Sequence, residues 1–292
     1  NTASNNTAVG RDALNANTSG ENNTAVGSKT LDLCTTGPRN VAVGSFAMTN
    51  STTAEECVAV GQAALQNLTT GNQNTAVGQS AGYSMTTGAQ NTAVGRNALA
   101  QTTTGVTNTA IGYDCLRKNT TASNNAAGGY RALEENTTGT SNTAFGTEAL
   151  RENTTASNNT ALGYIALFAN TTGNQNTAVG KGALENLTTS NSCTAVGFEA
   201  LRSVTTGIRN CVVGRATANS VTTGNDNVAI GNGSLPNLTT GHGNVGIADI
   251  SVISTRLFNV TTENDRLILG HNNITNAYVK VALTVTSDER DK

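Results

Sequence analysis

The chain of 292 residues contains no Trp, only two Pro and two Met, and only 3% aromatic residues. Its apolar fraction is 36%, which is below the ~45–50% of an ordinary globular domain. Most of that fraction is Ala, Val and Leu, whose side chains are aliphatic and smaller than an aromatic ring system. This composition argues against the thick hydrophobic core of a conventional compact domain.

Charge is also scarce, at 12% of residues and a formal net charge of −2. There is neither a basic surface for nucleic acid nor an acidic tail. No apolar run approaches the ~18–20 residues of a membrane span, and no signal peptide is visible. Five cysteines match neither zinc-ligand spacing nor a disulfide framework, and His242 and His271 are isolated. We therefore expect no nucleic-acid partner, no membrane insertion, no metal and no cofactor.

What the chain does have is a repeat. A glycine returns every 17 residues, fourteen times from Gly10 to Gly231. Numbered from this glycine as position 0, position −4 is Asn in twelve repeats, position −2 is Ala in thirteen, and position +8 is Thr in all fourteen. Such regularity indicates stacked copies of one small unit, and hence a rod.

The charges indicate which side of the unit is solvated. All 25 charged residues from Arg11 to Asp226 occupy positions +1, +2, +5, +6, +11 or +12. Burying an unpaired charge inside the stack would strongly destabilise the fold, so these positions mark its solvent-exposed edge. The apolar N-T-A-V-G stretch is typical of a buried strand. The A-L pair at positions +3 and +4 is typical of a second short strand, and T-T-G is typical of a turn. The pattern predicts an all-β fold, a parallel β-solenoid or β-roll of about fourteen coils with two short parallel strands each.

A single coil of this kind has a thin core. Strand alternation places Val and Thr on one side and Ala, Gly and Asn on the other. Ordering the backbone costs ~1–2 kcal/mol per residue, which a few small apolar side chains hardly offset. We expect the Ala/Gly side to be a second burial surface, closed by packing three chains about one axis as a homotrimer. A free-standing monomeric solenoid is the alternative.

The period breaks after Gly231, because the next match, Asn244-Val245-Gly246, arrives two residues early. Segments 247–260, 266–269 and 277–285 are typical of ordinary strands. The sequence thus predicts a repeat shaft over 1–246, a β-rich neck over 247–286 and a separate end over 287–292.

The last residues, T-S-D-E-R-D-K, resemble the opening of the endosialidase-type intramolecular chaperone domain of phage tail spikes and fibres, and the lead-in N-A-Y-V-K-V-A-L-T-V is similar to such proteins. The repeats resemble phage fibre shafts and the heads of trimeric autotransporter adhesins, whose coils are usually shorter. The resemblance implies self-cleavage between Thr286 and Ser287, with Ser287 as nucleophile and Lys292 as its base. The alternative is a charged, solvated tail.

The few aromatic residues are concentrated at solvated positions. Tyr113, Tyr130, Tyr164 and Phe198 share position +1 and are candidates for stacking on a host glycan. The alternative is that these rings cap the edge of the roll and pack on long neighbours, as Phe46, Tyr83 and Phe168 at related positions would. The adjacent Thr columns at +8 and +9 point to opposite faces, so hydrogen bonding between coils explains them better than ice binding. The Asn column at −4 predicts side-chain amide ladders.

These features predict a structural and adhesive fibre rather than an enzyme, apart from one self-cleavage. We expect a phage tail fibre outside the cell, whose partners are its own trimer, other virion tail proteins and a host glycan or protein receptor. A bacterial trimeric surface adhesin and a monomeric binding solenoid are alternatives. A glycan hydrolase would need paired carboxylates, and Glu135 and Glu152 are better explained as solvated edge charges.

Overall fold

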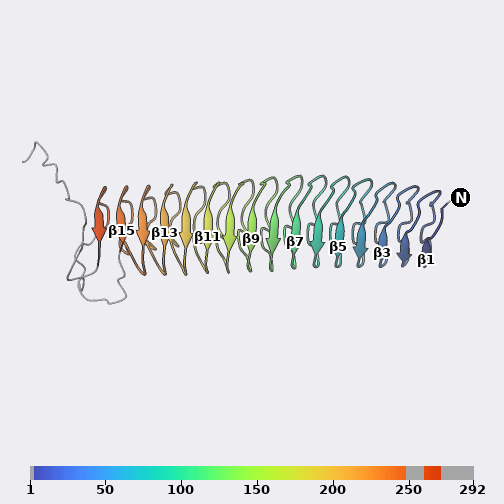
Figure 1. Cartoon of the computed structure of the whole chain (residues 1–292), viewed down its shortest axis with the longest axis horizontal. Helices are drawn as coiled ribbons and strands as arrows, with labels where there is room; N and C mark the ends of the chain where they lie inside the picture. Colours follow the sequence, from blue (N-terminus) through green and yellow to red (C-terminus); the bar gives the residue numbers. More distant parts are fainter. Residues whose placement is uncertain (1–2, 248–259, 271–292) are drawn as a thin grey trace, which may run out of the picture.

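The computed structural model describes residues 3–247 and 260–270, and in these ranges the chain winds into a rod with one short strand per coil (Figure 1). Sixteen parallel strands of three residues form one sheet, in which each strand pairs with the next along the chain. The predicted all-β parallel solenoid is confirmed. The strands are β1 (Thr7–Val9), β2 (Thr24–Val26), β3 (Val41–Val43), β4 (Val58–Val60), β5 (Thr75–Val77), β6 (Thr92–Val94), β7 (Thr109–Ile111), β8 (Ala126–Gly128), β9 (Thr143–Phe145), β10 (Thr160–Leu162), β11 (Thr177–Val179), β12 (Thr194–Val196), β13 (Cys211–Val213), β14 (Val228–Ile230), β15 (Val245–Ile247) and β16 (Leu267–Leu269).

The two sides of the sheet differ from the sequence prediction. In β5, Ala76 at position −2 is fully buried, whereas Val77 at −1 is 38% exposed. The Ala side faces the interior of its own coil, where Leu side chains of the returning limb, such as Leu65, fill the space. The position is occupied by Ala in thirteen repeats and by the fully buried Val212 in the other. The prediction that the Ala side awaits a partner is therefore wrong, and the side left open is the one that carries Val and Thr.

The second predicted strand is also absent from the described coils. Positions +1 to +6 form consecutive turns, because residues at +2 and +4 are left-handed: φ is 54° at Lys29 and 50° at Leu31. A β-strand requires negative φ at successive residues, so a segment in which every second residue has positive φ cannot form one. The limb is nevertheless bonded from coil to coil, since the Lys29 N–H donates to the Arg11 carbonyl (2.8 Å) and the Leu31 N–H donates to the Ala47 carbonyl (3.1 Å).

Two polar columns join successive coils. The buried Asn23 side chain donates from Nδ2 to the Gly37 carbonyl (2.9 Å), and its Oδ1 accepts the backbone N–H of Asn40 (2.9 Å). The predicted Asn ladder is thus confirmed, with backbone groups as its main partners. At position +8, the Thr35 hydroxyl donates to the carbonyl of Thr52 (3.2 Å), and the same bond recurs along the rod. Satisfied in this way, buried polar side chains stabilise the stack rather than destabilise it.

The period does not break where the sequence suggested. Val228 pairs with Val245 and Ala229 with Gly246, so Gly246 occupies the Ala position and not position 0. The interior accepts a glycine here because Leu235 fills the space: its Cγ lies 2.6 Å from where a Cβ of Gly246 would be. Strand β16 then pairs in parallel with β15 after a longer step. The remaining parts of the predicted neck, 248–259 and 271–286, and the end at 287–292 lie outside the described residues.

Candidate binding surfaces

A row of aromatic and cationic side chains follows position +1 along the rod. The rings of Tyr113 and Tyr130 stack, with centroids 5.6 Å apart and planes 14° from parallel. The guanidinium of Arg96 lies over Tyr113 (5.6 Å) and that of Arg131 over Tyr130 (5.1 Å). Cation–π contacts of this kind stabilise exposed sites by ~0.5–1 kcal/mol. The two rings are exposed, but each turns a face toward a neighbour.

The other two predicted rings lie further along the same row. Tyr164 and Phe198 are two coils apart, and Lys181 between them places its ammonium over both rings, at 5.8 Å and 5.5 Å. Arg215 lies over the far side of Phe198 at 5.8 Å. The structure therefore brings the four predicted residues into one row, in which long cationic neighbours cover ring faces. This packing is the alternative stated above, and the glycan role of the row stays a prediction.

Arg131, which lies over Tyr130, also contacts a buried carboxylate, that of Glu134. Glu134 is 3% exposed, although position +5 was predicted to be solvated throughout; Asp114, 6% exposed, departs from that prediction as well. Glu134 tolerates burial because three guanidinium groups surround it: Arg117 at 2.8 Å, Arg151 at 3.4 Å and Arg131 at 3.6 Å. Removing one partner of such a buried cluster is strongly destabilising, because it leaves the remaining charges uncompensated.

The two carboxylates considered for hydrolysis each lie beside a cation. Glu135 pairs with Lys118, and the Glu152 carboxylate lies 3.6 Å from Arg151. Both are thus compensated by cations. In the described residues, no group of three or more His, Cys, Asp or Glu side chains converges as a metal site would require, and no helix is long and apolar enough to cross a membrane. Ser287 and Lys292, the predicted self-cleavage pair, lie outside the described residues.

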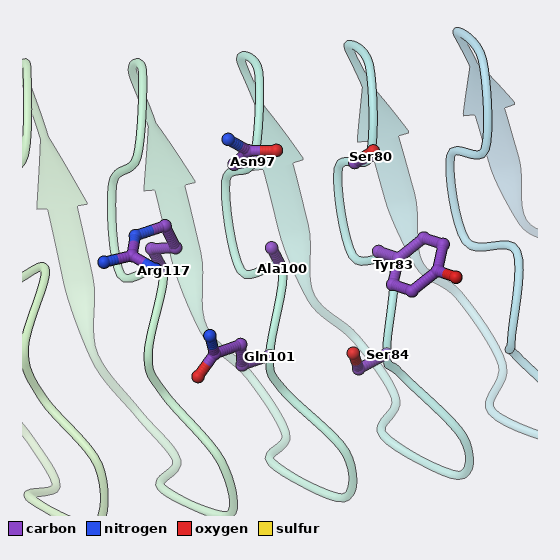
Figure 2. A pocket seen from close by; sticks show the side chains of 7 residues that line it. All are labelled: Ser80, Tyr83, Ser84, Asn97, Ala100, Gln101 and Arg117. Carbon is purple, nitrogen blue, oxygen red and sulfur yellow. The ribbon is translucent and has the colours of Figure 1, made fainter.

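A notch interrupts the turn limb in the coil directly before that of Tyr113 (Figure 2). Its volume is about 380 Å³, and Ala100 lies in its middle, between Tyr83 at one end and Arg117 at the other. Polar side chains complete the lining: Ser80, Ser84, Asn97 and Gln101. This site was not predicted from the sequence. Its signal was present, because Ala100 is the one Ala at position +5 among the fourteen repeats.

The outward side chains of β1–β16, at positions −3 and −1, form a continuous strip that we call the T-x-V face. Val77, Ile111 and Ile230 on this face are 38%, 48% and 43% exposed. At ~4.8 Å per strand, the sixteen strands give it a length of about 70 Å. Monomeric proteins rarely expose an apolar strip of this extent, so the T-x-V face is a candidate interface.

The cysteines divide by burial. Cys34, Cys57, Cys115 and Cys193 are buried, and burial raises the pKa of the Cys57 thiol to about 11 and that of Cys115 to about 12. Cys211 is exposed, at the first position of β13. It therefore lies on the T-x-V face.

Comparison with known proteins adds no assignment: no protein-family model, no curated protein and no solved structure matches the chain.

Proposed function

We propose that this protein is the shaft of a homotrimeric fibre, in which three chains pack their T-x-V faces about a shared axis and present the turn limbs outward. The observation that carries the proposal is the exposed T-x-V face of β1–β16, whose column at position −1 is Val, Ile, Leu or Phe in every strand except β8, where Gly128 stands. Two side-chain columns over about 70 Å offer on the order of 1,000 Å² per chain. A stable interface needs about 800 Å² from each partner, so the face is large enough.

The geometry of the coil supports a spacer. From β1 to β15, successive repeats bond through the sheet, the turn limb and the Thr column, and also through the Asn column except where Cys57 and Cys193 replace Asn. A rigid shaft holds a binding surface at a fixed distance from its attachment point. The resemblance of the final residues to the chaperone domain of phage fibres favours a phage tail fibre that mediates attachment to a host surface, with other virion tail proteins as partners. A trimeric bacterial surface adhesin would use the same shaft.

The experiment is the native mass of the purified chain, measured by sedimentation equilibrium. A trimer gives three times the chain mass of 29.7 kDa, and a single-chain mass would reject the packing of three chains through their T-x-V faces. The double variant Val77→Lys, Val94→Lys places charges in the interface and should dissociate the trimer. The matched control is Gln79→Lys, Arg96→Lys, two residues along in the same coils at the solvated position +1, where Lys181 already occurs. The control should keep the mass of the parent chain.

Cys211 supplies a second test without any substitution. In a parallel trimer whose chains are in register, the three Cys211 thiols lie at the same height around the axis. Mild oxidation should therefore link two chains, while the four buried cysteines do not react. Cys211→Thr, which restores the common residue of position −3, should form the trimer without the cross-link. A trimer whose Cys211 thiols never cross-link would reject the T-x-V face as the interface.

A further inference from the structure

The notch at Ala100 differs from the surface on either side of it. At position +5, successive coils carry Gln66, Tyr83, Ala100, Arg117 and Glu134. A methyl group between a tyrosine and an arginine leaves a gap one coil wide. The gap results from a single small residue in a column of large ones, and its volume of about 380 Å³ lies within the range of small-molecule sites.

The polar groups around the gap are free to bind a ligand. Among the described residues, the hydroxyls of Ser80 and Ser84 and the amide of Gln101 make no hydrogen bond to the protein. Elsewhere on the rod, glutamine side chains pair between coils, as Gln79 does with Gln62 (3.3 Å). The notch thus presents unpaired hydroxyl and amide groups above and below Ala100 (Figure 2).

Asn97 is oriented by its own neighbour. Its Nδ2 donates to the Asp114 carboxylate at 2.9 Å, so its amide oxygen turns the other way, toward Ser80 (Figure 2). This fixed orientation leaves an acceptor beside a hydroxyl that can donate or accept. The upper edge of the notch is therefore preorganised.

Tyr83 differs from the four aromatic residues of the row. Among the described residues, no other ring and no cation lies over it. Its side chain is 38% exposed, and Figure 2 shows the ring broad side on at the end of the notch. An uncovered aromatic face beside unpaired hydroxyl and amide groups matches a sugar, which has an apolar face of C–H groups and a rim of hydroxyls.

The charge at the other end is already compensated. Both Nε and Nη2 of Arg117 donate to the Glu134 carboxylate, at 3.0 Å and 2.8 Å, and the guanidinium points away from the notch (Figure 2). Arg117 thus lines the notch mainly with its aliphatic stem. A site without an uncompensated cation favours hydroxyls over carboxylates.

We propose that the notch centred on Ala100 binds one neutral hexose unit of a glycan, with the Tyr83 ring against the C–H face of the sugar and Ser80, Ser84, Asn97 and Gln101 bonded to its hydroxyls. The inference rests on the adhesive part of the proposed function. It assigns that role to this notch and not to the row of Tyr113, Tyr130, Tyr164 and Phe198, whose rings already contact a neighbouring ring or cation.

The test is a titration of the full chain with maltohexaose, cellohexaose and mannohexaose, followed by saturation-transfer difference NMR, with a hexamer of galacturonate as the acidic probe. We expect saturable binding of at least one neutral hexamer. The variant Ala100→Gln fills the notch with the residue that position +5 already carries at Gln66, so the coil should fold normally. It should weaken binding about ten-fold or more, as should Tyr83→Ala.

Two controls match these variants. Ala100→Ser keeps the notch open and should bind as the parent chain does, and Tyr113→Ser, Tyr130→Ser removes the stacked pair and should also leave the affinity unchanged. Binding of no neutral hexamer, preference for the galacturonate hexamer, or loss of binding in the tyrosine double variant but not in Ala100→Gln would each overturn the proposal. The native mass of each sample separates the outcomes. A trimer that binds no hexose rejects the sugar site at the notch alone, whereas a monomer that binds a hexose rejects the trimeric packing alone.

Discussion

The glycine at position 0 is a strict requirement of the coil, and Gly112 shows why. Its φ is +144°, a region that residues with a side chain essentially do not adopt. A Cβ at this position would lie 2.7 Å from the carbonyl carbon of Gly129 in the next coil. Gly112→Ala therefore adds backbone strain of ~1–3 kcal/mol and steric overlap of ~1–3 kcal/mol, while the loss of unfolded-state freedom returns only ~0.4–1 kcal/mol. We expect a net destabilisation of about 3–4 kcal/mol.

Gly182 provides the matched control, because the same substitution there meets neither obstacle. Its φ is +64°, and the nearest atom to a Cβ is the Glu185 Oε2 at 3.3 Å, the end of a side chain that pairs with Arg202, and no backbone atom lies close. Ala63 and Ala216 hold the same position in other coils at φ of 59° and 49°. The cost of a left-handed Ala, ~1–2 kcal/mol, is partly offset by the unfolded-state gain, so Gly182→Ala should change stability by only about 1 kcal/mol.

Urea unfolding measures both variants, and amide hydrogen exchange localises the effect. In a stack of repeats, each unit contacts only its neighbours, so Gly112→Ala should raise exchange in the coils around β7 and β8 more than at the distant coils. Equal stabilities of the two variants would refute the argument that the coil spacing at position 0, and not the general flexibility of glycine, requires this residue.

Three further predictions concern buried polar groups and thiols. Glu134→Gln should lower the free energy of unfolding by about 2–4 kcal/mol because it leaves three guanidinium groups without their shared carboxylate, whereas Glu135→Gln, at the more exposed neighbouring position, should cost less than about 1 kcal/mol in the same urea titration. Asn142→Ala should cost about 2–3 kcal/mol in thermal unfolding, because the carbonyl of one coil and the N–H of the next both lose their partner. The raised thiol pKa values of Cys57 and Cys115 make stability fall with pH: above about 9 the unfolded chain releases protons that the folded chain retains, up to pH about 11 and about 12. Urea midpoints between pH 8 and 10.5 should therefore decrease less when both cysteines are replaced by Ala, and an unchanged slope would contradict this linkage.

The repeat period predicted the solenoid because spacing alone determines which residues align between coils. It could not determine which side of the strand faces inward, since Ala76 and Val77 are both apolar. That choice depends on the space left by Leu65 and its equivalents on the opposite limb, which is a property of the folded coil. The prediction of a second strand was wrong for a similar reason. Leucine disfavours positive φ, so its conformational propensity does not predict the left-handed conformation of Leu31.

The candidate sites were predictable to different degrees. The row from Tyr113 to Phe198 followed directly from the shared position, but the covering of its faces depends on how Arg96, Lys181 and Arg215 extend. The notch exists because Ala100 has a small side chain at position +5, where the neighbouring repeats have large ones. Alanine is not chemically distinctive, so the residue type alone does not indicate a site. Comparing each position with the same position in other repeats would have found it.

The direction of the hydrogen bonds between coils has a mechanical consequence. These bonds join residues 17 apart, such as Thr35 and Thr52, and so run along the rod. When the two ends are pulled, every junction carries the full force in series, and the rod ruptures at its weakest junction however many coils it has. Three chains bound side by side would share an axial load among three rows of junctions.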